Sequence, residues 1–141
     1  MNIMVENLVA GVPVTVVRLE GELDASNYQE FITRANSLYR DGTRHVLLDL
    51  SDLSFLSSSG LVALHSVALT MRGEKPPDPA AGWDVFHAIS HDLDRQPGPQ
   101  ANIKLVNPQP RVARTLEVSG FSRLLPIFSD KEAALASFAQ G

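Results

Sequence analysis

The chain has 141 residues, of which 44% are hydrophobic and 20% charged, and its formal net charge is −4. This composition is typical of one globular domain with a sizeable core, and the scattered Lys and Arg residues give no basic face for nucleic acid. Because the chain has no cysteine, disulfides, thiol catalysis and thiolate metal sites are excluded.

Two apolar runs at residues 3–9 and 14–19 flank a turn that contains glycine and proline, and they predict an N-terminal β-hairpin. Ser26 and Gln29 form a capping box, which predicts the start of the first helix. Apolar residues then recur at helical spacing until about residue 41, where an Asp-Gly pair is expected to end the helix.

The middle of the chain predicts a buried strand and a second helix. Residues 45–50 are short and largely apolar, which is typical of a strand buried in a parallel sheet. After a short polar loop, the second helix is expected to begin near Ser58 and to end at Gly73. Its predicted inward-facing residues are Leu61, Leu64, Ala68 and Met71.

Two more strand–helix pairs are predicted in the C-terminal part. Residues 102–106 and 124–128 are expected to be the strands, and a capping box at Ser129 and Glu132 predicts the last helix. The apolar positions of the third helix are Val112, Leu116 and Val118. Strand and helix therefore alternate after the hairpin, which predicts βα units and an α/β fold.

Residues 75–100 interrupt this alternation and hold five of the nine prolines. We therefore expect a single domain over residues 1–141 with a proline-rich insertion at about 74–101. The middle of the insertion has apolar residues near helical spacing and could form a short amphipathic helix. Trp83 and Phe86 would then either anchor a partner or hold the insertion against the domain.

Two histidines of the insertion are candidates for metal binding. His87 and His91 are four residues apart, which on a helix places both rings on one face, and Asp84 and Asp94 are near in sequence. Solvated histidines have the same spacing, and the spacing alone is a weak signal. We expect no metal and no cofactor.

A cluster of three serines, Ser57, Ser58 and Ser59, lies at the predicted start of the second helix. One serine is enough to cap a helix. No acidic residue occupies the first turn, so a phosphate added there would meet unpaired N–H groups and the positive end of the helix dipole. The cluster is therefore either a structural cap or a site of phosphorylation.

A nucleophilic role for Ser58 is the alternative from another class of function. A nucleophile elbow has the pattern Gly-x-Ser-x-Gly, and here Gly60 supplies the second glycine while Leu56 replaces the first. The histidines form no obvious triad with this serine; they are His45, His65, His87 and His91. A small serine hydrolase is thus supported only by a half-formed motif, and we expect no enzyme activity.

Residues Leu53–Leu61 resemble the signature loop of the STAS domain family, which includes bacterial anti-sigma factor antagonists. Leu19–Asp24 resembles the family's turn before its first helix, and His45–Leu50 resembles its central strand. Val112–Phe121 resembles its third helix and the exit from it. The resemblance covers nearly the whole chain apart from the insertion, and it implies a mixed β-sheet of about five strands with about four helices mainly on one face.

The resemblance also implies a phosphorylation switch. It places the family's phosphoacceptor at Ser58, with Ser57 as the alternative, because Ser57 stands where the family usually has Asp. In the family, a serine kinase that is itself an anti-sigma factor phosphorylates this serine with ATP. The unmodified antagonist binds the kinase and frees the sigma factor, whereas the phosphorylated form does not bind.

The partner-binding surface implied by the resemblance gathers at one end of the sheet, where strand–helix loops meet. Its expected residues are Glu22, Asp24, Ser57, Ser58, Ser59 and Gly60. The alternative within the family is a scaffold of a stress-sensing assembly or a small cytoplasmic subunit of a lipid transporter. ATP and magnesium belong to the kinase, so this chain is expected to need neither.

The expected localisation depends on two kinds of segment that the sequence does not show. No apolar run reaches the length of a membrane span, and the N-terminal residues do not have the pattern of a signal peptide. We therefore expect a cytoplasmic protein. The resemblance implies that its partner is an anti-sigma factor or serine protein kinase, and weak self-association is a further possibility.

Overall fold

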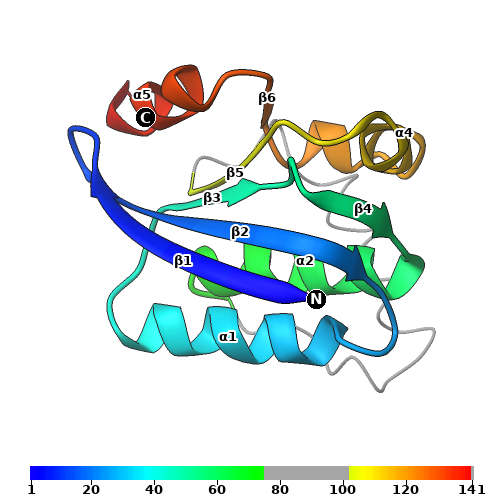
Figure 1. Cartoon of the computed structure of the whole chain (residues 1–141). Coiled ribbons are helices and arrows are strands. Elements are labelled where there is room, and N and C mark those ends of the chain that lie inside the picture. Colours follow the sequence, from blue (N-terminus) through cyan, green and yellow to red (C-terminus); the bar gives the residue numbers. More distant parts are fainter. Residues whose placement is uncertain (75–101, 141) are drawn as a thin grey trace.

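The computed structural model of the chain describes residues 1–74 and 102–140 (Figure 1). The expected insertion lies outside these residues except for Glu74, and so do Trp83, Phe86, His87 and His91. The elements in chain order are β1 (Asn2–Val9), β2 (Pro13–Leu23), α1 (Tyr28–Arg40), β3 (Val46–Asp49), β4 (Leu53–Leu56), α2 (Ser58–Met71), β5 (Ile103–Val106), α4 (Pro110–Val118), the 3-10 helix η2 (Phe121–Arg123), β6 (Ile127–Phe128) and α5 (Lys131–Gln140).

The described strands form one mixed sheet in the order β1-β2-β3-β5-β6, and β4 pairs with β2. β1 and β2 form the predicted antiparallel hairpin, whereas the other strand pairs are parallel. The predicted mixed α/β fold is thereby confirmed. The sheet has six strands rather than about five, and β4 is the additional one.

The prediction of a short polar loop before the second helix is wrong, because residues 53–56 form β4. β2 is long enough to pair first with β3 and then, through its last residues, with β4. Leu53 and Leu56 of β4 are buried, and the Ser54 hydroxyl donates to the Gly21 carbonyl at 2.9 Å. The serine that favours a loop in sequence is therefore part of a strand pairing.

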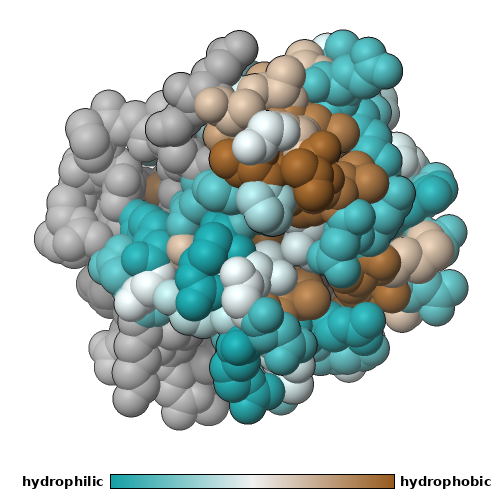
Figure 2. All heavy atoms as spheres, turned by 90° about the vertical axis from the view of Figure 1, so that its left-hand side faces the viewer, coloured by the Kyte–Doolittle hydropathy of each residue, from teal (hydrophilic) through white to brown (hydrophobic). Residues whose placement is uncertain are grey.

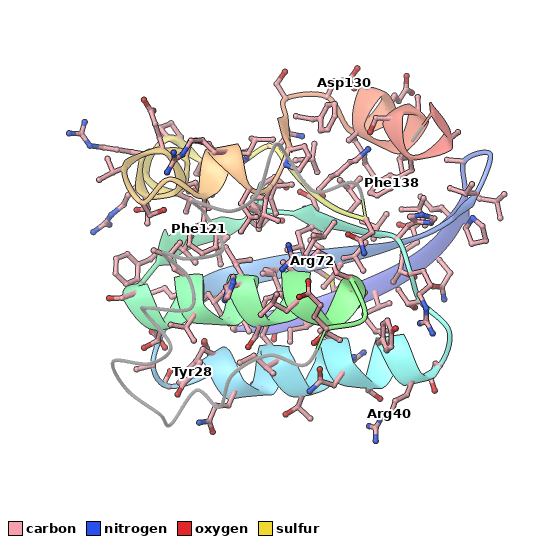
Figure 3. The ribbon with its side chains drawn as sticks, turned by 180° about the vertical axis from the view of Figure 1, so that it is seen from behind. Tyr28, Arg40, Arg72, Phe121, Asp130 and Phe138 are labelled. Carbon is pink, nitrogen blue, oxygen red and sulfur yellow. The ribbon has the colours of Figure 1, made fainter. Side chains whose placement is uncertain are left out.

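Side chains alternate between the two faces of the sheet and build two cores. The larger core includes Val17 and Leu48 and is covered by α1, α2 and α4. The smaller core lies on the opposite face, where Leu47 packs with Phe138 of α5 (Figure 3). Three of the four described helices thus cover one face, as expected.

α2 is the central helix of the larger core, and α1 packs along it (Figure 1). Every residue of α2 from Val62 to Met71 is buried. A helix that is apolar nearly all round is typical of such a position. The predicted inward stripe therefore describes only part of the buried surface, and its first member, Leu61, is only half-buried.

The capping box predicted for the first helix is wrong. α1 begins at Tyr28 and its N-cap is Asn27, not Ser26. The Ser26 hydroxyl instead donates to the Asp24 carboxylate at 2.5 Å, and the Asp24 carbonyl accepts from the Asn27 and Tyr28 N–H groups. A nearby carboxylate thus takes the hydroxyl that the capping box requires.

The start of α5 also differs from the prediction. Asp130 accepts the backbone N–H of Glu132 at 3.1 Å, in the place expected for Ser129, because a carboxylate is favoured at the positive end of a helix dipole. The preceding strand is shorter than residues 124–128. Leu125 donates its N–H to the Phe121 carbonyl at 2.9 Å, so η2 and its turn replace the first part of the strand.

Lys104 is a buried cation in the smaller core. Its side chain is 6% exposed, and Nζ donates to the Ser137 hydroxyl at 2.8 Å. Nζ also lies 4.5 Å from the centre of the Phe138 ring, which is a favourable cation–π distance. Burial lowers the pKa of Lys104, because the charged form loses its hydration.

We expect Lys104→Met to change how stability depends on pH. A lysine pKa below its unfolded value of 10.5 means that the folded state binds its proton less tightly, so folding becomes more favourable as pH rises toward that value. The free energy of unfolding of the wild type should therefore rise relative to that of Lys104→Met as the pH is raised toward 10.5. Urea titrations at several pH values measure this; parallel curves would contradict it.

Candidate functional site

The ends of β2 and β4 bring two strand–helix loops together at one edge of the sheet. The Gly21 N–H donates to the Asp52 carbonyl and the Ser57 N–H donates to the Leu23 carbonyl, both at 3.0 Å. These bonds place the loop of residues 24–27 beside the start of α2. The structure therefore brings together the two segments that hold the expected partner-binding residues.

Gly60 allows α2 to start this close to β2. A Cβ atom at this position would lie 2.6 Å from Leu56 Cδ1 and 2.8 Å from the Leu23 carbonyl oxygen. Both distances are shorter than real Cβ contacts, so only glycine fits without a shift of the helix. Gly60 is buried, and it acts by setting the position of the serines rather than by offering a surface.

The three serines have different environments. Ser57 is the N-cap of α2, and its hydroxyl accepts the Gly60 N–H at 3.1 Å. Ser58 occupies the first helical position and is exposed, and its hydroxyl has no hydrogen-bond partner among the described residues. Ser59 is half-buried. Of the three, Ser58 offers the hydroxyl that is both accessible and uncommitted.

The predicted acidic residues lie in the neighbouring loop. Glu22 is exposed, and its carbonyl accepts from the Asn27 side chain at 2.7 Å. The Asp24 carboxylate accepts the hydroxyl and the backbone N–H of Ser26, and these bonds lower the pKa of Asp24. Asp24 is therefore fixed in a local turn and stays ionised, while the side chain of Glu22 extends from the end of β2.

α4 also borders the candidate site, although none of its residues is among those expected from the sequence. A hollow of about 400 Å³ lies between the start of α2 and the exposed face of α4. Its lining residues are Ser58, Leu61, Arg114, Thr115, Val118 and Ser119. We call this hollow the Ser58 groove. It joins the candidate phosphoacceptor to apolar and cationic side chains of α4.

Val118 corrects one expectation for the third helix. Val112 and Leu116 are buried as predicted, but Val118 is 78% exposed. It follows Leu116 by two residues, which turns its side chain by about 200° around the helix axis. Counting positions around α4 would have found this exposed apolar residue, since Arg114 and Val118 are four residues apart and lie on one outward face.

No described histidine or carboxylate pairs with Ser58. His65 is buried in α2, and His45 lies 3.3 Å from the Pro13 carbonyl near the hairpin.

Within the described ranges, no group of three or more metal-ligating side chains could hold an ion. In the same ranges, none of the helices combines the length and apolarity that a transmembrane span requires.

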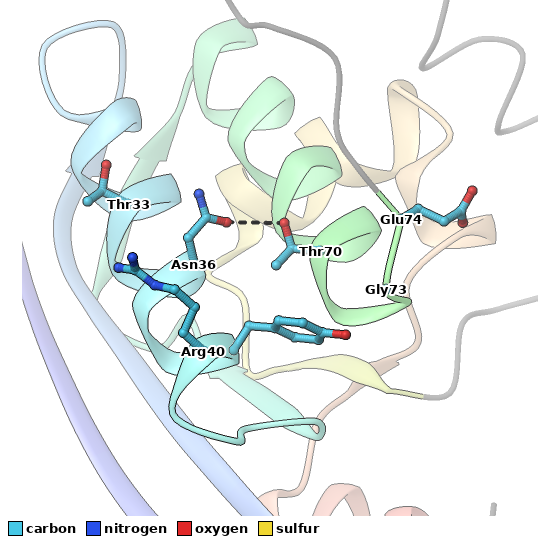
Figure 4. Close-up of a pocket in the computed structure, with 7 residues that line it drawn as sticks. Thr33, Asn36, Arg40, Thr70, Gly73 and Glu74 are labelled. Carbon is cyan, nitrogen blue, oxygen red and sulfur yellow. Dashed lines mark hydrogen bonds between the residues drawn. The ribbon is translucent and has the colours of Figure 1, made fainter.

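Among the described residues, two hollows that lie away from Ser58 are larger than the Ser58 groove. One, of about 540 Å³, lies between the C-terminal parts of α1 and α2, where the Thr70 hydroxyl donates to Asn36 at 3.2 Å (Figure 4). The other, of about 500 Å³, is beside the hairpin tip, in the region where Figure 2 shows apolar side chains gathered around the tip and α5. Val9 at this tip is 83% exposed. Neither hollow contains any of the expected site residues.

Ser57→Ala is expected to destabilise the protein by about 1 kcal/mol, because the Gly60 N–H loses its cap. Ser58→Ala removes a hydroxyl with no described partner and should change stability by less than about 0.5 kcal/mol. Chemical denaturation of the two variants measures the difference. Equal losses would show that Ser57 is not the cap.

The mixed sheet and the exposed serine at the first position of its central helix define an α/β domain that presents a strand–helix junction on its surface. The sequence pattern of the STAS domain matches residues 7–74, which run from β1 through the whole of α2. Over these residues the chain is therefore similar to the STAS domain family.

Relatives of known name are similar over most of the chain. A Bordetella bronchiseptica protein named as an anti-sigma factor antagonist, BtrV, is 26% identical over 120 residues, which are 85% of this chain and 82% of that protein. The crystal structure of an anti-sigma factor antagonist from Mycobacterium paratuberculosis has a TM-score of 0.67 and 18% identity, covering 97% of this chain and 92% of that one. The structure of phosphorylated SpoIIAA from Bacillus has a TM-score of 0.51 and 18% identity, and the match covers 94% of this chain and 96% of SpoIIAA. At this identity, the two structures establish the shared fold.

Proposed function

We propose that this chain is an anti-sigma factor antagonist, and that phosphorylation of Ser58 switches its binding to an anti-sigma serine kinase. The proposal treats residues 1–141 as one STAS domain that acts in the cytoplasm. The observation that carries it is the contrast between two adjacent serines. Ser57 uses its hydroxyl to cap α2, whereas the Ser58 hydroxyl is exposed and uncommitted.

The similar proteins support this role. BtrV and the Mycobacterium structure are named as anti-sigma factor antagonists, and SpoIIAA has been solved in unphosphorylated and phosphorylated forms. The proposed contact surface combines the Ser58 groove with Glu22 and the loop around Asp24. It offers an apolar seat at Leu61 and Val118 with charges around it.

Phosphorylation would alter this surface without a change of fold. A phosphate adds nearly two negative charges at neutral pH, and at the first helical position it would lie at the positive end of the α2 dipole. The first turn of α2 has no acidic residue, so no carboxylate opposes the new charge from within that turn. We therefore expect the phosphorylated domain to stay folded while the charge of its contact surface changes.

The proposal is tested by incubating the chain with anti-sigma serine kinases of its source organism, one at a time, with magnesium and ATP. We expect one phosphate per chain and, in peptide mapping by mass spectrometry, its position at Ser58. Ser58→Ala should take up no phosphate, whereas Ser57→Ala should still be modified. Phosphate on Ser57, or no phosphorylation by any of the kinases, would contradict the assignment of Ser58.

Self-association of the chain stays a prediction, which light scattering of the same samples would test.

A further inference from the structure

The Ser58 groove places the candidate phosphoacceptor opposite a cation. Ser58 contributes from the first position of α2 and Arg114 from the middle of α4, and both residues are exposed. The two elements are far apart in sequence but meet at the same hollow of about 400 Å³. A phosphate on Ser58 would extend into a space that the Arg114 side chain already borders.

Arg114 is uncommitted in the described part of the chain. Four other arginines have partners there: Arg18 pairs with Asp52, Arg72 with Glu74, Arg44 with backbone carbonyls and the Tyr39 ring, and Arg111 lies over the Phe55 ring. Arg114 has neither a hydrogen bond nor an ion pair with any described residue. Glu117, three residues further along α4, also lies beyond ion-pair distance from it. The guanidinium is therefore available to a new anion.

We infer that Arg114 is the internal partner of a phosphate on Ser58, and that this pairing withdraws from the docking protein a cation that it uses in the unmodified state. The inference rests on the proposed function. In the unmodified domain, a carboxylate of the partner would pair with Arg114 while an apolar side chain sits on Val118. After phosphorylation, the guanidinium forms charge-assisted hydrogen bonds with the phosphate instead.

This pairing assigns two effects to one modification. The phosphate raises the negative charge at the groove, and it also neutralises the cation that an acidic partner would recognise. The phosphate is the favoured partner of Arg114, because it is attached to the same molecule and needs no association step. Ser58 thus carries the phosphate, whereas Arg114 holds it in place through an ion pair.

The test uses protein with phosphoserine incorporated at position 58 during translation, so that no kinase is needed. The second pKa of the phosphate, about 6 in a free phosphoserine, is followed by phosphorus NMR. We expect Arg114→Gln to raise this pKa by about half a unit or more, since a nearby cation favours the doubly charged form. Arg123→Gln is the matched control, because it removes an exposed arginine that does not line the groove. Equal pKa values in the wild type and Arg114→Gln would overturn the pairing.

Binding to the kinase tests the second half of the inference. Arg114→Gln should weaken binding of the unmodified protein about tenfold or more, and phosphorylation should then reduce affinity by a smaller factor than in the wild type. If phosphorylation reduced the affinity of Arg114→Gln for the kinase by the same factor as that of the wild type, the phosphate and the kinase would not compete for Arg114. If the pKa shift is observed but phosphorylation leaves kinase binding unchanged, the pairing stands and the proposed function fails.

Discussion

Phosphorylation of Ser58 is expected to weaken binding of the anti-sigma partner about a hundredfold or more, which corresponds to roughly 3 kcal/mol. A partner that covers Leu61 and Val118 must also cover a doubly charged phosphate, and removing these charges from water is costly even when Arg114 pairs with them. Isothermal titration of the kinase with unmodified and phosphoserine-58 protein measures the difference directly.

The matched control for this experiment is phosphoserine at position 129. Ser129 is exposed before α5 and away from the Ser58 groove, so the same charge there should change the affinity less than about threefold. Measuring both proteins at low and high salt separates a local effect from long-range repulsion, because long-range terms are screened. Equal losses at the two positions would show that net charge, rather than the groove, controls binding.

Gly60→Ala is expected to lower the free energy of unfolding by about 1–3 kcal/mol, although alanine is the better helix former. The added methyl group would overlap Leu56 Cδ1 and the Leu23 carbonyl oxygen, and a backbone atom cannot move aside as a side-chain end can. Chemical denaturation measures the loss.

Ser59→Ala is the control for Gly60→Ala, because it changes the preceding residue in the same helix turn. Ser59 is half-buried and makes no side-chain hydrogen bond with any described residue, so its replacement should change stability by less than about 0.5 kcal/mol. An unchanged stability of Gly60→Ala would mean that α2 can move away from β2. In that case the position of Ser58 would not depend on the close approach.

Much of the architecture could be predicted from the sequence, because it depends on local patterns. The hairpin and the buried strand within residues 45–50 follow from apolar periodicity, and Gly73 marks the turn just after the end of α2. β4 could not be predicted in the same way, because its Leu-Ser-Phe-Leu sequence is short and becomes a strand only through pairing with β2. The starts of α1 and α5 differ from the prediction because nearby carboxylates form bonds that the serine patterns do not show. Asp24 accepts the Ser26 hydroxyl, and Asp130 accepts the Glu132 N–H.

Only part of the candidate site could likewise be predicted from the sequence. The serine cluster and the need for glycine at position 60 are visible in the sequence, because they concern one turn of one helix. Arg114 is not, since the sequence does not show that α4 lies across from the start of α2. The roles of Ser57 and Ser58 also required coordinates: both are serines at a helix start, and only the bond to the Gly60 N–H distinguishes them.

The path of β1 has a practical consequence for binding assays. As the first strand runs antiparallel to β2, the Met1 Cα lies 3.6 Å from the Cβ position of Gly21, next to Glu22. A purification tag or fluorophore fused ahead of Met1 would emerge at the rim of the docking surface and could block it. The end of α5 lies on the far side of the molecule (Figure 1), so reporter groups should be attached there.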